Sequence, residues 1–208
     1  MNTELLTSLE RVKWDILSQT YGSSHSTLIG LLVDWWITNS TGESHWVLES
    51  GLPYKKREPG EKGEQQERCD AILVEKDTFK GIVEAEGSRY ESTIEKMMKY
   101  FSSDYLDCQN LQFGIFLAYG YGCQPQTWEE YMKKFIRWGK KNTERLREKH
   151  PGKQLVILAL NKSCEQKKLG SHTLGEYCWT PYQVSGTIIQ DGKELTPAHP
   201  LVWSRQSQ

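Results

Sequence analysis

Hydrophobic residues recur at intervals of three and four positions in two segments near the start of the chain. Residues 3–19 place leucine, valine and isoleucine at this spacing, and a second segment from Leu28 repeats it until the polar run 39–42. This periodicity is typical of amphipathic helices, so we expect two of them. The pattern also predicts a short strand at 45–49, and the charged, Gly- and Pro-containing residues 53–67 predict a long loop.

Two runs rich in strand-forming residues follow, with a short polar segment between them. Residues 68–75 read Arg-Cys-Asp-Ala-Ile-Leu-Val-Glu, residues 80–87 read Lys-Gly-Ile-Val-Glu-Ala-Glu-Gly, and residues 76–79 lie between them. Strand-forming runs this close together predict a β-hairpin.

The chain then alternates between helical periodicity and continuous apolar runs of strand length. The pattern predicts a helix at 88–101, a strand at 111–117, a helix at 128–150 and a strand at 155–160. This order of elements predicts an α/β fold with a central mixed β-sheet flanked by helices. We expect a single domain over residues 1–208, with a core of 1–160 and an irregular C-terminal extension at 161–208 that carries a hairpin around Asp191 and Gly192.

The charge of the chain is nearly balanced, with 26 Lys and Arg residues against 27 Asp and Glu residues. A balanced total argues against a polycation that coats nucleic acid without specificity, although it leaves room for local basic patches. The 8 Trp and 10 Tyr residues supply enough apolar surface to exclude a disordered chain.

The cysteines and the N-terminus indicate the compartment. The 5 cysteines are an odd number without a CxxC pair, so we expect reduced thiols in a cytoplasmic protein. The N-terminal residues include acids where a signal peptide requires a basic start, and Gly30 and Asp34 interrupt the apolar run 28–37. We therefore expect neither export nor a membrane span.

Acidic residues fall at corresponding positions on the two strands of the predicted hairpin. If paired positions sum to about 155, Asp70 lies opposite the stretch from Glu84 to Glu86, because cross-strand neighbours are about 5 Å apart. A register within one residue of this estimate brings the three carboxylates together. Like charges this close repel unless a cation compensates, and the usual cations are Mg²⁺, Mn²⁺ or a Lys or Arg side chain.

These residues resemble the motif of the PD-(D/E)XK nuclease superfamily, the fold of many restriction endonucleases. The resemblance consists of Asp70, a 13-residue interval and Glu84-Ala85-Glu86 within a helix-strand-strand-strand-helix-strand order. It covers roughly residues 1–120 and implies a restriction-endonuclease-like core. It also implies that Asp70 and Glu84 hold Mg²⁺, or alternatively Mn²⁺, with the carbonyl of Ala85 as a further ligand.

Two positions depart from the pattern of the family. Glu86 stands where the family usually has lysine, and Cys69 replaces the proline. Some restriction enzymes that resemble this family carry a glutamate at this position, as a metal ligand or as a base. In other members the lysine comes from the following helix, which makes Lys96, ahead of Lys99, the candidate here.

The resemblance implies a divalent-metal-dependent nuclease that hydrolyses phosphodiester bonds of DNA with a metal-activated water as the nucleophile. Asp70, Glu84, Glu86 and Lys96 would then be the catalytic residues. Many nucleases of this kind act as homodimers. The alternative is a noncatalytic α/β module that binds nucleic acid or a protein partner, in which the acids form salt bridges.

The predicted helix at 128–150 carries the clearest basic run of the chain. Its candidate nucleic-acid-binding residues are Lys133, Lys134, Arg137, Lys140 and Lys141. Cations on one helix can follow a phosphate backbone. The alternative is a solvated helix face with ion pairs within the helix, because Glu144 and Glu148 interrupt the run.

Overall fold

The computed structural model describes most of the chain. The described residues are 8–12, 24–53, 66–87, 90–103, 106–121, 125–168, 177–195 and 203–204.

The fold is built on one eight-stranded mixed β-sheet, in which β1 to β7 lie side by side in sequence order and β8 pairs with β6. This confirms the predicted α/β class with a central mixed sheet flanked by helices. The strands are β1 (Ser44–Pro53), β2 (Gln66–Glu75), β3 (Thr78–Glu86), β4 (Phe113–Tyr121), β5 (Gln154–Lys168), β6 (Tyr177–Gln190), β7 (Lys193–Leu195) and β8 (Trp203–Ser204).

The strand directions follow from the connections. β1, β2 and β3 form an antiparallel meander, whereas β3, β4 and β5 are parallel to one another. Parallel neighbours need a crossover connection, and these crossovers contain α3 (Tyr90–Phe101) with the short α4 (Leu106–Gln109), and then α5 (Pro125–Lys149). β5, β6 and β7 are again antiparallel.

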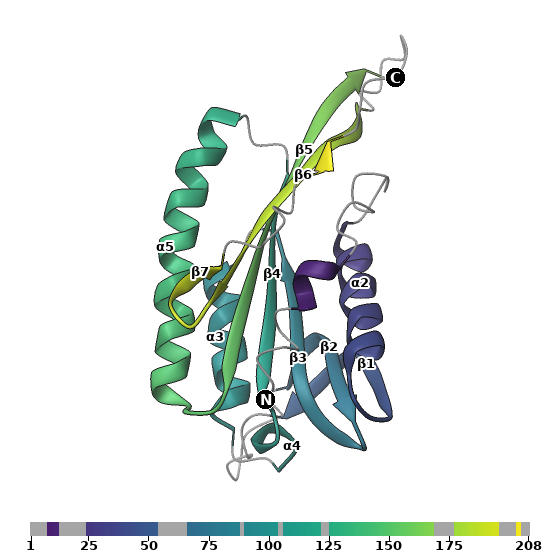
Figure 1. Ribbon diagram of the computed structural model, residues 1–208, viewed down its shortest axis with the longest axis vertical. Helices are drawn as coiled ribbons and strands as arrows, with labels where there is room; N and C mark the ends of the chain where they lie inside the picture. The colour runs from purple at the N-terminus through teal and green to yellow at the C-terminus, as the bar shows by residue number, and fades with distance from the viewer. Residues whose placement is uncertain are drawn as a thin grey trace, which may run out of the picture.

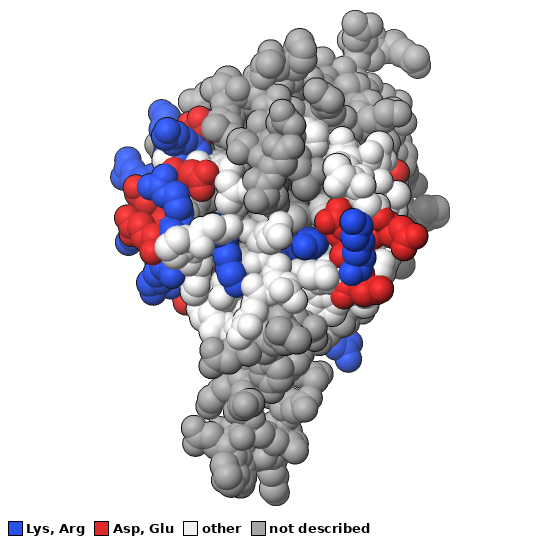
Figure 2. All heavy atoms as spheres, turned by 60° about the horizontal axis from the view of Figure 1, so that its bottom comes forward, with Lys and Arg blue, Asp and Glu red and all other residues white. Residues whose placement is uncertain are grey.

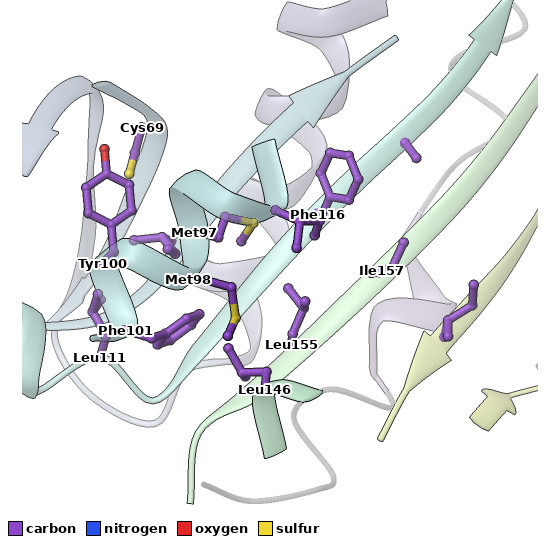
Figure 3. Packing of buried hydrophobic residues seen from close by; sticks show 14 of the residues in the cluster. Cys69, Met97, Met98, Tyr100, Phe101, Leu111, Phe116, Leu146, Leu155 and Ile157 are labelled. Carbon is purple, nitrogen blue, oxygen red and sulfur yellow. The ribbon is translucent and has the colours of Figure 1, made fainter. Parts of the chain in front are cut away.

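Helices cover both faces of the sheet (Figure 1). On one face, α2 (Ser24–Asn39) packs Leu28, Leu32 and Trp36 into a cluster with Val83, Ile115 and Leu158. On the other face, α3 and α5 pack Met97, Phe101 and Leu146 into a cluster with Ile82, Phe116 and Ile157 (Figure 3). Strands covered on both faces need continuous apolar sequence, which explains the runs in β4 and β5.

The N-terminal expectations lie largely outside the described residues. Of the helix expected at 3–19, the structure describes the 3₁₀ helix η1 (Ser8–Arg11). Leu9 is fully buried, and Ser8 Oγ accepts a hydrogen bond of 2.7 Å from Trp35 Nε1. The loop expected at 53–67 also lies mostly outside the described residues, because β1 ends at Pro53 and β2 begins at Gln66.

The β2–β3 hairpin has a shorter turn than the sequence suggested. Lys76 and Asp77 both adopt positive φ, at 48° and 57°, and Glu75 already pairs with Thr78. A two-residue turn with positive φ at both positions has a backbone twist that matches the right-handed twist of the flanking strands. A bulge between Leu73 and Val74 then shifts the register, so that Ala71 pairs with Val83. This register lies within one residue of the expected one.

The C-terminal region differs from the irregular extension that we expected at 161–208. β5 continues to Lys168, and β6 pairs with it antiparallel from Gln190 to Tyr177. In Figure 1 this long hairpin extends beyond the rest of the sheet. These mostly polar stretches form strands because their backbones pair with each other. Backbone pairing does not require apolar residues at regular intervals, so the sequence pattern did not predict these strands. The turn expected at Asp191 and Gly192 is present, between β6 and β7.

Among the helices of the described residues, none is both long enough and apolar enough to cross a membrane.

We expect Gly81→Ala to lower the free energy of unfolding by about 1–3 kcal/mol, because it overpacks the core. A Cβ at Gly81 would lie 2.5 Å from two ring atoms of Phe113. That ring is 1% exposed and packs 5.7 Å from the ring of Trp36, so it has no room to move. Urea denaturation measures the change.

Gly30→Ala is the matched control, since a Cβ at this helical position meets nothing within 4 Å. Alanine is a better helix former than glycine, so this variant should gain about 1 kcal/mol. Equal stability of the two variants would contradict the packing that we describe around Phe113.

Candidate functional site

The site lies where β2 and β3 part. Backbone pairing between the two strands runs from the turn to Ala71 and Val83. Beyond that pair, the Asp70 side chain replaces a backbone acceptor, and its Oδ2 accepts a hydrogen bond of 2.7 Å from the amide of Ala85. The first carboxylate of the motif thus bridges the two strands through its side chain.

Asp70 also meets a residue that sequence reasoning did not select. His25, near the start of α2, places Nε2 3.1 Å from Asp70 Oδ2, and the two side chains are 38% and 23% exposed. The five histidines show no metal-ligand spacing. The local sequence therefore contained no signal for His25, because only the packing of α2 on the sheet brings it to Asp70.

Lys96 of α3 forms an ion pair with Glu84. Its Nζ lies 2.6 Å from Glu84 Oε2 and donates a second hydrogen bond of 2.9 Å to the carbonyl of Arg68. The structure therefore brings the lysine of the following helix to the acidic site, while Lys99 is exposed on α3.

Glu84 is a buried carboxyl group, with a side chain only 4% exposed. Its pKa is raised from 4.5 to about 7: burial is the largest cause, Lys96 opposes it, and the nearby charge of Asp70 adds to it. Its Oε1 has no hydrogen-bond partner of ordinary geometry among the described residues. The charged form of Glu84 is thus only partly compensated.

The Cys69 thiol is a neighbour of Glu84 on the α3 side of the sheet, beside Tyr100 (Figure 3). Burial, and then the charge of Glu84, raise the pKa of this thiol well above its usual value. A neutral thiol is a weak hydrogen-bond donor and gives little stabilisation to a carboxylate.

Glu86 is oriented toward its own backbone. Its Oε1 accepts a hydrogen bond of 2.8 Å from the amide of Gly87. Within the described ranges, no group of three or more His, Cys, Asp or Glu side chains is disposed to hold a metal ion. The Asp70 carboxylate meets the backbone of Ala85, the residue after Glu84, and Glu86 does not join these two acids in such a group.

The basic residues of α5 are interspersed with acids. Lys133, Arg137 and Lys141 are exposed, whereas Lys140 lies 3.6 Å from Glu194 of β7. The side chain of Lys134 lies outside the described residues. Farther along α5, Arg145 forms a two-point contact with Glu95 of α3, at 3.0 and 3.4 Å. Figure 2 shows blue and red side chains interleaved on this side of the molecule rather than one basic face.

Comparison of the chain with protein-family models, with curated proteins and with solved structures finds no match. Function must therefore be inferred from the site itself. Two neighbouring carboxylates, one of them buried and incompletely paired, favour a cation, and Lys96 supplies a positive charge beside them. Such a group can bind a divalent cation and an anionic ligand together.

We expect wild-type protein to lose stability relative to Glu84→Gln as the pH rises from about 4.5 to about 7. The native state holds the Glu84 proton more tightly than the unfolded state, because its pKa is raised to about 7. That stabilisation is complete at low pH and is lost as the pH rises through the native pKa. The difference in unfolding free energy should change by about 1–3 kcal/mol across this window.

Urea denaturation at pH 5, 6, 7 and 8 measures this difference. Glu43→Gln removes an exposed carboxylate beside the β2–β3 turn, at the opposite end of the hairpin, and serves as the control. If the unfolding free energies of Glu84→Gln and of the wild type change with pH in the same way, the raised pKa of Glu84 is wrong.

Proposed function

We propose that the chain is a divalent-metal-dependent nuclease that hydrolyses phosphodiester bonds of DNA. The observation that carries this proposal is the convergence of Asp70, Glu84 and Lys96 at the point where β2 and β3 part. A buried carboxyl group with a raised pKa, such as Glu84, beside other charged groups is characteristic of functional sites.

The order of the elements supports a restriction-endonuclease-like core. The sequence resemblance implied helix, three strands, helix and strand, and α2, β1, β2, β3, α3 and β4 follow that order. The acids lie on the second and third of these strands, where the resemblance expects them. In this proposal the lysine comes from α3, since position 86 of β3 is a glutamate and Lys96 contacts Glu84.

The residues at the site fit Mg²⁺, with Mn²⁺ as an alternative. Mg²⁺ commonly takes one or two protein carboxylates and keeps several waters, and Asp70 and Glu84 supply two carboxylates, with the carbonyl of Ala85 as a further ligand. Glu84 Oε1 is buried with no hydrogen-bond partner of ordinary geometry among the described residues, and the neighbouring Cys69 thiol is only a weak donor, so a cation there would stabilise it. When bound, the ion would polarise the scissile phosphate and lower the pKa of a coordinated water.

Lys96 has two tasks in this proposal. Its positive charge favours the ionised form of Glu84, the form that binds a cation. It also places a fixed positive charge where negative charge develops on the phosphate during hydrolysis. The hydrogen bond from Lys96 to the carbonyl of Arg68 holds the ammonium group in this position.

The exposed cations of α5 and the free thiols support the rest of the proposal. Lys133, Arg137 and Lys141 can contact phosphates away from the cleavage site. Cys69 and Cys108 are free and buried, which agrees with a reducing cytoplasmic compartment.

A noncatalytic module that binds nucleic acid or a protein partner is the second candidate. The observation that favours it is that both acids already have partners, since Asp70 contacts His25 and Glu84 contacts Lys96. In that case the contacts would be structural salt bridges, and added metal would have no effect.

We expect purified protein to cut supercoiled plasmid in Mg²⁺ or Mn²⁺ and not in EDTA. Asp70→Asn, Glu84→Gln and Lys96→Met should each lower the rate at least about a hundredfold, because each removes a ligand or the charge that stabilises the phosphate. Gel electrophoresis measures the rate, with Glu43→Gln as the control. A short RNA assayed in parallel distinguishes a DNA-specific enzyme from a general nuclease.

We expect Mg²⁺ to raise the melting temperature at pH 8 in wild type and not in Asp70→Asn. At about a hundred times its Kd, an ion that binds only the folded state adds about 2.7 kcal/mol. For a domain of this size, that is about 5–10 °C. Thermal melting with and without EDTA measures the shift. If metal causes neither a shift nor cutting, the noncatalytic module is the correct interpretation.

A further inference from the structure

A pocket of about 330 Å³ lies between α2 and β1 and opens to solvent. Its walls are formed by Ile29, Gly30 and Val33 of α2 and by Trp46 and Leu48 of β1. The volume is at the lower end of the range of about 300–1,000 Å³ that is usual for small-molecule sites.

The pocket begins at the candidate functional site. His25 and Asp70 line it, and Leu48 pairs with Ala71, the residue after Asp70. Trp46 pairs with Leu73, two residues farther along β2. The pocket therefore runs from the Asp70 carboxylate along β2 toward the indole ring.

Polar and apolar groups are separated within the pocket. His25, Ser26 and Asp70 supply donors and acceptors at one end, and the rest of the lining is aliphatic or aromatic apart from the backbone at Gly30. Trp46 and Leu48 are 40% and 54% exposed, which leaves apolar surface uncovered. A Cβ at Gly30 would meet nothing within 4 Å, so the wall is open there.

We propose that this pocket receives an unpaired nucleobase of the strand that is cut, and that the protein therefore acts on single-stranded or locally unpaired DNA. This inference rests on the proposed nuclease function and names its substrate class. A base is a flat ring with a polar edge, which suits apolar walls with donors and acceptors at one end. Exposed aromatic side chains bind bases by stacking, and this tolerates any base sequence.

The location of the pocket explains why pairing matters. A phosphate at Asp70 and Glu84 places an adjoining nucleotide at the mouth of the pocket, because Asp70 belongs to both sites. A base inside an intact duplex is stacked and paired and must leave the helix to enter such a pocket. An already unpaired base avoids that cost.

The test uses one 5′-labelled DNA oligonucleotide in three forms: single-stranded, fully paired, and paired except for one unpaired base. Fluorescence anisotropy in EDTA measures binding without cutting, and gels in Mg²⁺ measure cutting of the same molecules. We expect the two forms with an unpaired base to bind about tenfold more tightly than the full duplex and to be cut faster. Abasic substitution along the strand should reveal one position beside the cut where loss of the base weakens binding.

Two variants alter the pocket without touching the acids. Gly30→Leu places a side chain in the open wall of a helix that tolerates leucine, and its control is Thr38→Leu, at an exposed position of α2 that does not line the pocket. Trp46→Ala removes the stacking surface, and its control is Val47→Ala, the exposed neighbour on β1. We expect Gly30→Leu and Trp46→Ala to lose the preference for unpaired bases and both controls to keep it.

The outcomes separate this inference from the proposed function. Cutting of all three forms at one rate, unchanged by Gly30→Leu, would overturn the base pocket and leave the nuclease in place. Binding that prefers unpaired bases and is lost in Gly30→Leu, without cutting, would support the pocket and overturn the nuclease. A protein that binds none of the forms, or a wild-type dimer that Trp46→Ala dissociates without any base preference, would overturn the pocket.

Discussion

The ion pair between Glu84 and Lys96 joins the central strand of the motif to the helix that crosses over it. Its carboxylate is almost fully buried, and burial raises its pKa to about 7 even with the ammonium group 2.6 Å away. Removing two charges from water often costs more than their attraction returns, so a buried pair is weak evidence for a purely stabilising role. The pair links β3 to α3 and leaves a local demand for positive charge at the buried carboxylate.

The surroundings of Asp70 and Glu84 differ, although both lie where β2 and β3 part. Asp70 is on the α2 side, where His25 and the amide of Ala85 satisfy Oδ2. Glu84 pairs through Oε2 with Lys96 of α3, while Oε1 has no partner of ordinary geometry among the described residues and the Cys69 thiol nearby is only a weak donor. Asp70 of β2 and Glu84 of β3 thus have partners from different helices, and the charge balance of the site involves α2, α3 and the sheet together.

The same architecture accounts for the pocket beside the site. α2 packs on the sheet through its buried leucine and tryptophan residues. Gly30 faces away from these contacts, and a Cβ there would meet nothing within 4 Å, so the space between α2 and β1 is open. Among the strands that the structure describes, β1 pairs with β2 alone, and its Trp46 and Leu48 lie partly in solvent. An edge strand normally avoids exposed apolar residues, so their retention here agrees with a bound ligand that has flat apolar surfaces.

Local sequence determined the elements and much of the acidic site. Apolar periodicity predicted α2, α3 and α5, the continuous runs predicted β4 and β5, and hairpin pairing brought Asp70 to Glu84 within one residue. These features depend on side chains that are close in sequence. The resemblance offered Lys96 and Lys99 as candidates, and the packing of α3 decided that Lys96 meets Glu84. The contact between His25 and Asp70, the orientation of Glu86 and the length of the β5–β6 hairpin were likewise decided by the tertiary structure. Each of them depends on how helices pack on the sheet, how a side chain turns at a strand end or how distant backbones pair, and such contacts leave no periodic trace in the sequence.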